Sequence, residues 1–145
     1  MKITFDTPKP HEEDEIIIRC HVVDDDLMHL IYNFKDHKEG ITAYQQREIV
    51  KLSPKDIFYF ESVDNRVFAC CEKQVYEVKL KLYEVEEALS HKDFIRISKS
   101  VIVNLNKINS VTPLLNCRLE ASLQNAEKII ISRQYVPKLK KSLGI

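Results

Sequence analysis

Three polar interruptions in a strand-rich sequence carry the side chains best suited to contact an anion. They are Asp64-Asn65-Arg66, the stretch Arg96–Ser100, and Ser132-Arg133-Gln134. Arginine binds guanine edges or phosphates through paired hydrogen bonds, asparagine and glutamine can read adenine, and lysine and serine bind phosphate. Because loops on a rigid β scaffold commonly carry recognition groups, these residue types favour contact with nucleic acid. Such a contact requires a fold that brings the three interruptions together.

The sequence contains no motif for catalysis or metal binding. None of its serines stands in G-x-S-x-G, and the two glycines, Gly40 and Gly144, form no phosphate-binding loop. Glu86 and Glu87 are adjacent acids, but we expect them on the polar side of a helix, where charge serves ordinary solvation. The five histidines and four cysteines lack zinc-ligand spacing. We therefore expect no enzyme activity, no cofactor and no metal site.

The cysteines are typical of a reduced, intracellular protein. Cys70 and Cys71 are neighbours on an expected strand, where successive side chains point to opposite faces and a disulfide would be strained. We interpret these thiols, with Cys20 and Cys117, as small apolar residues. The N-terminus carries acids and prolines instead of an apolar signal, and no apolar run approaches the roughly 20 residues of a membrane span. A cytoplasmic protein that is not inserted in a membrane is expected.

The net charge of zero conceals a strong asymmetry along the chain. Residues 1–42 hold 5 Lys/Arg and 10 Asp/Glu, whereas residues 91–145 hold 10 Lys/Arg and 3 Asp/Glu. Such asymmetry indicates an anionic partner for the basic part, either nucleic acid or an acidic protein. In the second case the chain would be a protein-interaction module. A further alternative is that the two ends neutralise each other in the fold.

Residues 43–145 have the pattern of an all-β, sandwich-like module. Short runs of β-branched and aromatic residues alternate with turn residues. Two small helices are expected at 82–91 and 133–143, the second with Pro137 in its first turn and an N-terminus that could bind phosphate at Arg133. The predicted strands are 47–52, 57–62, 66–71, 75–80, 94–98, 101–105, 108–115, 117–123 and 128–132.

One hairpin and its strand can be predicted in more detail. Asp64 and Asn65 both tolerate positive φ, so a two-residue hairpin turn is expected between the strands that flank them. Strict alternation along the preceding strand would give two faces of three residues each. The expected faces are Ile57, Tyr59 and Glu61 on one side, and Phe58, Phe60 and Ser62 on the other.

Residues 1–42 are expected to form a small β-α appendage. Glu15–Val23 is rich in β-branched residues and is predicted to be a strand. Residues 24–38 are predicted to be a helix capped by Asp24 or Asp25, with residues 38–46 as a linker around Gly40. The apolar face of the helix either packs on the appendage's own strand or is partly shared in a dimer. That face consists of Leu27, Leu30, Ile31 and Phe34.

Four blocks of sequence resemble, in order and spacing, the LytTR-type DNA-binding domain of bacterial transcription regulators. They are DIFYFESVDNRVFACC, LYEVEEAL, FIRISKSVIVNLNKI and IIISRQYVPKLKKSLG. The third contains F-x-R-x-x-x-S-x-x-V-N, met by Phe94, Arg96, Ser100, Val103 and Asn104. The last contains S-R followed by L-K, met by Ser132, Arg133, Leu139 and Lys140. The resemblance covers about residues 45–145, so we assign 43–145 to this domain and 1–42 to the appendage.

The resemblance implies an elongated stack of three small antiparallel sheets, with about ten strands and short helices. Its loops would enter successive major grooves of promoter DNA that carries direct repeats. Asn65, Lys99 and Arg133 fall on the base-contact positions, and the first two depart from the residues most common there. The supporting contacts to the DNA backbone would be Arg66, Arg96, Ser98, Ser100, Gln134 and Lys138.

Two further expectations concern partners and the core. Similarity to short stand-alone members of the family implies double-stranded DNA as the partner, a homodimer, and a membrane-protein partner encoded in the same operon. Control by phosphorylation of a receiver domain is not expected, because residues 1–42 are too short for one. Asn104 is expected to be a buried amide that satisfies backbone groups of a loop.

Overall fold

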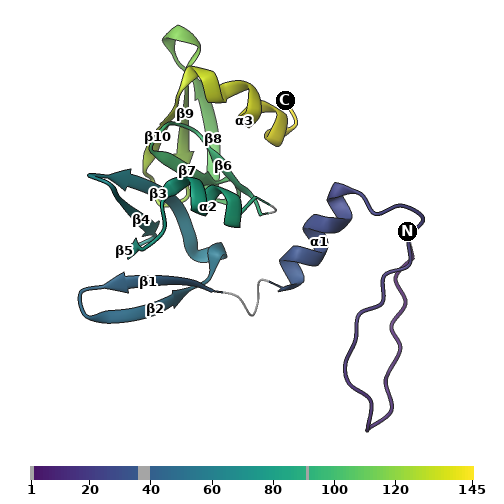
Figure 1. Cartoon of the computed structure of the whole chain (residues 1–145). Coiled ribbons are helices and arrows are strands. Elements are labelled where there is room, and N and C mark those ends of the chain that lie inside the picture. Colours follow the sequence, from purple (N-terminus) through teal and green to yellow (C-terminus); the bar gives the residue numbers. More distant parts are fainter. Residues whose placement is uncertain (1, 36–39, 91) are drawn as a thin grey trace.

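The computed structural model describes residues 2–35, 40–90 and 92–145, which form ten strands and three α-helices (Figure 1). The helices are α1 (Asp25–Lys35), α2 (Leu82–Ala88) and α3 (Val136–Leu143). The strands are β1 (Ile41–Gln45), β2 (Glu48–Leu52), β3 (Ile57–Val63), β4 (Arg66–Cys71), β5 (Val75–Val78), β6 (Phe94–Arg96), β7 (Val101–Asn104), β8 (Ile108–Pro113), β9 (Leu119–Leu123) and β10 (Lys128–Ile131). Four 3-10 turns, η1 (Pro54–Asp56), η2 (Leu105–Lys107), η3 (Leu115–Cys117) and η4 (Arg133–Tyr135), complete the order. The mostly β class is confirmed.

The strands form two antiparallel sheets, not the three that the resemblance implied. The larger sheet has the order β2-β1-β5-β4-β3-β7-β6, and the smaller has the order β10-β9-β8. All nine strands expected between residues 47 and 132 are present, and β1 is an additional strand. The β1–β2 hairpin joins the larger sheet where Tyr44 pairs with Glu77. This pairing extends one sheet to seven strands and accounts for the lower number of sheets.

The expected linker at residues 38–46 is wrong over most of its length. Residues 41–45 form β1, in which Ala43 is fully buried, while residues 38 and 39 lie outside the described part of the chain. A strand can form here because β2 and β5 both offer pairing partners. The expected domain boundary between residues 42 and 43 therefore falls inside a strand of the larger sheet.

The expected strand at residues 15–23 is also wrong. These residues have no regular secondary structure, and all of them are exposed. In Figure 1 the segment that precedes α1 extends away from the sheets. Neither sheet includes this segment, and an extended run is not stable as a strand without hydrogen-bonding partners. Within the described residues the appendage therefore contributes α1 alone, and packing of α1 on its own strand is excluded.

Helix α1 begins as expected. The side-chain oxygen Oδ1 of Asp24 accepts a hydrogen bond from the backbone N–H of Leu27 at 2.9 Å, which confirms the cap. Leu27 and Ile31 are half-buried, and Leu30 is 48% exposed. The side chain of Phe34 and residues 36–38 of the expected helix lie outside the described residues. No helix in the described ranges combines the length and apolar character that crossing a membrane requires.

Strand β3 departs from simple alternation. Ile57 and Phe60 belong to one buried cluster, whereas Phe58 and Tyr59 pack with another. The register of β3 against β4 shifts between Ile57 and Tyr59, and such a bulge lets two successive side chains face the same way. The expected grouping of Ile57 with Tyr59, and of Phe58 with Phe60, is therefore wrong.

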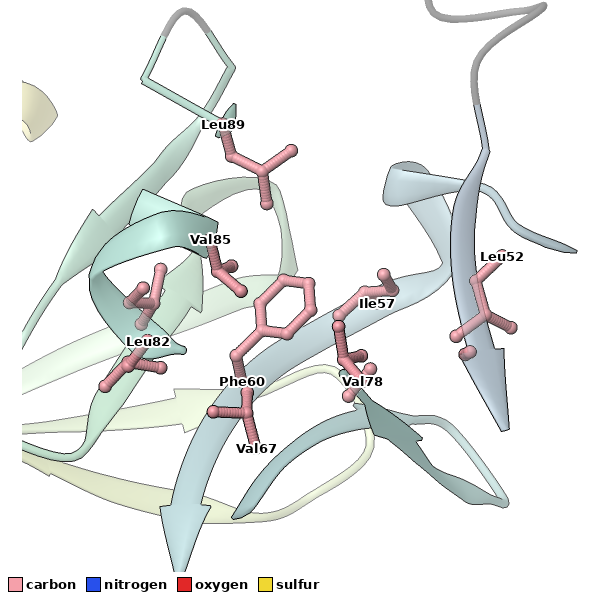
Figure 2. Close-up of a cluster of buried hydrophobic side chains, with 11 residues drawn as sticks. Leu52, Ile57, Phe60, Val67, Val78, Leu82, Val85 and Leu89 are labelled. Atoms are coloured by element: carbon pink, nitrogen blue, oxygen red, sulfur yellow. The ribbon is translucent and has the colours of Figure 1, made fainter. Parts of the chain in front are cut away.

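The first buried cluster lies between the larger sheet and α2 (Figure 2). Val85 of α2 and Leu89, which caps the end of that helix, point toward the ring of Phe60, whose centroid lies 5.6 Å from that of Phe94. Full burial of one such side chain contributes about 1.5–3 kcal/mol. This cluster fixes α2 on the sheet and, with it, the acidic side chains that α2 carries on its other face.

The second buried cluster joins the larger sheet to the smaller sheet and α3. Phe58 and Val103 from the larger sheet lie in it, together with Leu123 from the smaller sheet. Ile131 at the end of β10 and Leu139 in α3 are both 0% exposed. These two residues anchor the chain on either side of the expected contact residue Arg133.

The expected structural role of Asn104 is confirmed. Its side chain is 3% exposed, and its Nδ2 donates a hydrogen bond to the carbonyl oxygen of Ile57 at 2.9 Å. Its Oδ1 accepts a hydrogen bond from the backbone N–H of Asn106 at 3.0 Å. The amide thus satisfies backbone groups of β3 and of the turn that follows β7.

Replacing Asn104 by alanine should lower the free energy of unfolding by about 1–3 kcal/mol, since buried backbone groups lose their partner. Denaturant unfolding would measure the change. Asn106→Ala is the matched control, because it removes an exposed hydrogen bond to Asp93 and should change stability by less than about 0.5 kcal/mol. Equal losses in the two variants would contradict a special role for Asn104.

The interpretation of the cysteines as small apolar residues holds for two of the four. Cys70 is buried and Cys71 is half-buried, and burial raises the pKa of Cys70 to about 11. Cys20 and Cys117 are exposed, so for them the interpretation is wrong. Both lie on segments outside the buried clusters, where a thiol has no apolar surroundings to join.

Candidate nucleic-acid interface

The hairpin tip at Asp64-Asn65 and the loop at residues 98–100 lie at the same end of the larger sheet. Strands β3 and β7 are antiparallel, with Glu61 opposite Val101. One residue further on, the backbone N–H of Ser62 donates a hydrogen bond to the carbonyl oxygen of Ser100 at 2.8 Å. Because β3 continues from Ser62 into the hairpin, two of the three polar interruptions are neighbours.

The third polar segment, residues 132–134, is joined to the same end of the larger sheet by another backbone hydrogen bond. Ser132, which follows β10, donates its N–H to the carbonyl oxygen of Ile97 at 2.9 Å. The two segments line one open depression, formed by Ser98, Lys99, Ser100, Ser132, Arg133 and Gln134. We refer to residues 64–65, 98–100 and 132–134 together as the loop edge.

The hairpin tip has the expected conformation. Asp64 and Asn65 have φ values of 51° and 61°, and Val63 pairs with Arg66 across the turn. Two successive residues with positive φ are typical of the tight turns that match the twist of a hairpin. Asn65 is exposed at this tip, and its side chain has no hydrogen-bond partner within the described residues.

Arg96 stabilises the loop at residues 98–100 through hydrogen bonds to its backbone. Its Nε donates a hydrogen bond to the carbonyl oxygen of Ser98 at 2.8 Å, and its Nη2 donates to the carbonyl oxygen of Lys99. Its Nη1 forms an ion pair with Oε2 of Glu86 at 3.1 Å. Only 20% of the Arg96 side chain is exposed. One guanidinium thus fixes two successive carbonyl groups of the backbone that carries Lys99.

Two serines complete the loop. The Oγ of Ser98 accepts a hydrogen bond from the backbone N–H of Ser100 at 3.2 Å, and the two hydroxyl oxygens lie 3.5 Å apart. A serine that bonds the backbone two residues further on stabilises a turn. Small polar residues interrupt the strands here because they build this turn and leave the Lys99 side chain exposed.

Lys99, Arg133 and Gln134 are the exposed side chains of the depression. Within the described ranges none of them has a hydrogen-bond or ion-pair partner. Arg133 opens η4, which leads directly into α3, so the helix expected at 133–143 forms with a 3-10 first turn. Pro137 lies in the first turn of α3, as expected.

Arg66 forms an ion pair with an acidic residue of the neighbouring strand β5. Its Nε and Nη2 donate hydrogen bonds to the two carboxylate oxygens of Glu77 at 3.1 and 2.6 Å. These hydrogen bonds lower the pKa of Glu77 to about 2. The guanidinium also lies over the ring of Phe68, with its carbon 5.4 Å from the ring centroid. Arg66 therefore secures the base of the hairpin whose tip carries Asn65.

Lys138 does not line the loop-edge depression. It lines a different depression, between α2 and α3, together with Glu86, Ser142 and His29 of α1. Of the expected supporting residues, the structure thus places Ser98, Ser100 and Gln134 beside Lys99 and Arg133. It places Arg66 and Arg96 in internal ion pairs, and Lys138 elsewhere.

Glu86 is a positioning residue that the sequence analysis missed. Its carboxylate was expected to be an exposed, solvated charge on the polar side of a helix. In the structure it accepts a hydrogen bond from Arg96 and orients its guanidinium group. The two residues lie in different elements, Glu86 in α2 and Arg96 in β6, so neither helical nor strand periodicity relates them. The available signal was the presence of an arginine at the end of a strand that follows an acidic helix.

A tyrosine ties the larger sheet to the smaller one near the second buried cluster. The hydroxyl of Tyr59 donates a hydrogen bond to Oε2 of Glu127 at 2.8 Å. Burial, helped by this carboxylate, raises the pKa of Tyr59, so the hydroxyl remains a donor at neutral pH. The contact holds together the two sheets from which the loop edge is assembled.

Comparison with known proteins identifies the family of this fold. The family model of the LytTr DNA-binding domain matches residues 47–144. The chain belongs to the LytTR family. A solved LytTr DNA-binding domain from Bacillus cereus matches with a TM-score of 0.70 at 27% identity, covering 74% of this chain and 99% of that one. The family is one of DNA-binding domains.

Two curated relatives extend the comparison. An "Uncharacterized HTH-type transcriptional regulator" from Staphylococcus aureus is 30% identical over 147 residues, covering 100% of this chain and 99% of that protein. The "Sensory transduction protein LytT" from Enterococcus faecalis is 30% identical over 107 residues, covering 74% of this chain and 44% of that protein. The alignment with the first relative runs over the whole chain and therefore includes the appendage.

Proposed function

We propose that this chain is a sequence-specific, double-stranded DNA-binding transcription regulator that reads bases from its loop edge. The observation that supports it is the convergence of three separate polar segments on one end of the molecule, through hydrogen bonds of Ser62 and Ser132. In this proposal Asn65, Lys99 and Arg133 contact bases in successive major grooves. Their side chains are exposed and have no internal partner within the described residues.

The supporting residues divide into two groups in this proposal. Ser98, Ser100 and Gln134 contact phosphates beside the base-reading residues, because they line the same depression. Arg66 and Arg96 position the hairpin and the loop, because their guanidinium groups are held by Glu77 and Glu86. Lys138 lines the depression between α2 and α3 and not the loop-edge depression, so in this proposal it contacts a phosphate outside the site of Arg133.

A homodimer on direct repeats extends the proposal. Each chain would occupy one repeat, and the appendage would mediate contact between chains. Its exposed apolar residues, among them Ile16, Ile17 and Leu30, favour this role. A membrane-protein partner and a cytoplasmic location stay predictions from the sequence, as does the absence of control by a receiver domain.

The test is selection from a randomised duplex library by the full chain at about physiological salt, where non-specific binding is weak. The expected result is one short motif, recovered in direct orientation at a fixed spacing. Affinity for it should fall steeply as salt increases, since phosphate contacts release counterions. The measurement is the enriched sequence together with the slope of log affinity against log salt.

An unenriched pool from folded protein would contradict the proposal. It would favour the alternative, a protein-interaction module whose basic C-terminal half binds an acidic partner. A single motif without a direct repeat would keep the DNA-binding function and remove the direct-repeat arrangement. Folding is checked in the same sample by circular dichroism.

A further inference from the structure

The loop that joins β8 to β9 is exposed and has an unusual conformation. It spans residues 114–118 and is closed by a hydrogen bond from the N–H of Leu114 to the carbonyl oxygen of Arg118 at 2.9 Å. Asn116 and Cys117 have φ values of 62° and 60°. Two successive non-glycine residues with positive φ are uncommon, and such conformations cluster at functional sites.

The strand register places this loop at the loop edge. Pro113 pairs with Leu119, and Leu119 pairs in turn with Ile131, so the loop leaves the smaller sheet at the end where β10 leads to Ser132 and Arg133. In Figure 1 the β8–β9 loop projects at the top of the view, past the start of the segment that leads from β10 into α3. It therefore continues the series of loops beyond Arg133.

The side chains of this loop suit a nucleic-acid surface. Leu115 is 84% exposed at the tip, and Arg118 at the base is exposed as well. The loop contains no acid, and the nearest one in sequence, Glu120, faces Lys128 at 3.9 Å. Within the described ranges, the side chains of Leu115 and Arg118 have no polar or aromatic partner. An apolar tip beside a cation has no evident role in the fold.

We infer that residues 114–118 form a fourth DNA contact, in the minor groove next to the major groove that Arg133 reads. Leu115 lies against sugars and base edges of that groove, and Arg118 pairs with a flanking phosphate. Proteins that contact the minor groove commonly place apolar side chains such as leucine there, and the cation neutralises a phosphate. The inference rests on the proposed function, because it names a further contact of the same DNA-binding edge.

The experiment uses the full chain and the duplex motif selected by the wild type. Leu115→Ser and Arg118→Gln are compared with Ile49→Ser and Arg47→Gln, which change an exposed aliphatic residue and an exposed arginine on the distant β1–β2 hairpin. Leu115→Ser should weaken binding about 3- to 10-fold and remove the hydroxyl-radical protection that flanks the Arg133 contact. Arg118→Gln should lower the salt slope by about one. The two hairpin variants should match the wild type.

A second measurement is independent of these losses. A cleavage reagent attached to exposed Cys117, in a chain carrying Cys20→Ser and Cys71→Ser, should cut the minor groove beside the motif. The inference would be overturned if both loop variants kept the affinity and footprint of the wild type, or if the reagent cut at no fixed position. Selection of a motif by the wild type would still support the proposed function in that case. Failure of the wild type to select any motif would overturn both.

Discussion

Arg133→Ala should weaken binding to the selected duplex by about 1–3 kcal/mol, which is roughly 5- to 150-fold, and relax the sequence preference at one position. Arg133 is exposed, and its guanidinium has no partner within the described residues, so its five donors are available to a base edge. A bidentate contact to guanine is the commonest specific contact that arginine makes.

The fold should survive this change. Ile131 and Leu139, which flank Arg133, are both fully buried, and they hold η4 and α3 without help from the arginine. We therefore expect Arg133→Ala to change the free energy of unfolding by no more than an ordinary surface substitution does, about 0.5 kcal/mol. Any loss of affinity then reports on the interface.

Arg47→Ala is the matched control, since Arg47 is an exposed arginine on the β1–β2 turn at the far side of the larger sheet. Binding is measured against a set of duplexes that differ at single positions of the motif. A uniform loss for all duplexes, with a salt slope smaller by about one, would assign Arg133 to a phosphate instead of a base. An unchanged affinity would remove Arg133 from the interface.

The features that the sequence predicted well are those governed by neighbouring residues. The hairpin at Asp64-Asn65 forms because both residues tolerate positive φ, and α1 starts at Asp25 because the side chain of Asp24 caps its first turn. Alternating apolar residues located nine strands, and the spacing of four blocks identified the family. These signals are short-range, so one sequence is enough to read them.

The features that it missed depend on partners far along the chain. Residues 15–23 have a strand-like composition but no strand beside them, whereas residues 41–45 read as a linker and form β1 because β2 and β5 pair with them. The bulge after Ile57, which moves Tyr59 to the other face, is likewise set by pairing with β4. Pairing geometry of this kind is not encoded in local periodicity.

Arg96 is the clearest case within the site. Resemblance to the family placed it at a phosphate, and its charge alone gives no reason to expect otherwise. In the structure its donors are directed to the carbonyl oxygens of Ser98 and Lys99, and to Glu86. The residue type of Arg96 therefore did not reveal which groups it contacts, because those contacts depend on the positions of three partner residues.

Arg96→Met should weaken binding to the selected duplex about 10- to 100-fold and weaken non-specific binding less than threefold. The methionine keeps the apolar stem but cannot donate to the loop carbonyls, and one hydrogen bond to a charged group contributes about 1.5–3 kcal/mol. Water compensates in part, because the loop is near the surface. Loss of loop order would misplace Lys99, so discrimination between sequences falls while the total charge attraction changes little.

Arg96→Lys distinguishes this role from a phosphate contact. Lysine keeps the positive charge but lacks the planar fork that grips two carbonyl groups, so it should bind nearly as poorly as methionine. Glu86→Gln removes the charge that orients Arg96 but keeps an oxygen that can accept its hydrogen bond, and both loop contacts of Arg96 stay in place, so its loss of affinity should be smaller than that of either Arg96 variant. Faster hydrogen exchange at Ser98–Ser100 in the Met and Lys variants would give the physical cause. If Arg96→Lys bound with wild-type affinity and Arg96→Met had a salt slope smaller by about one, Arg96 would instead be a phosphate contact.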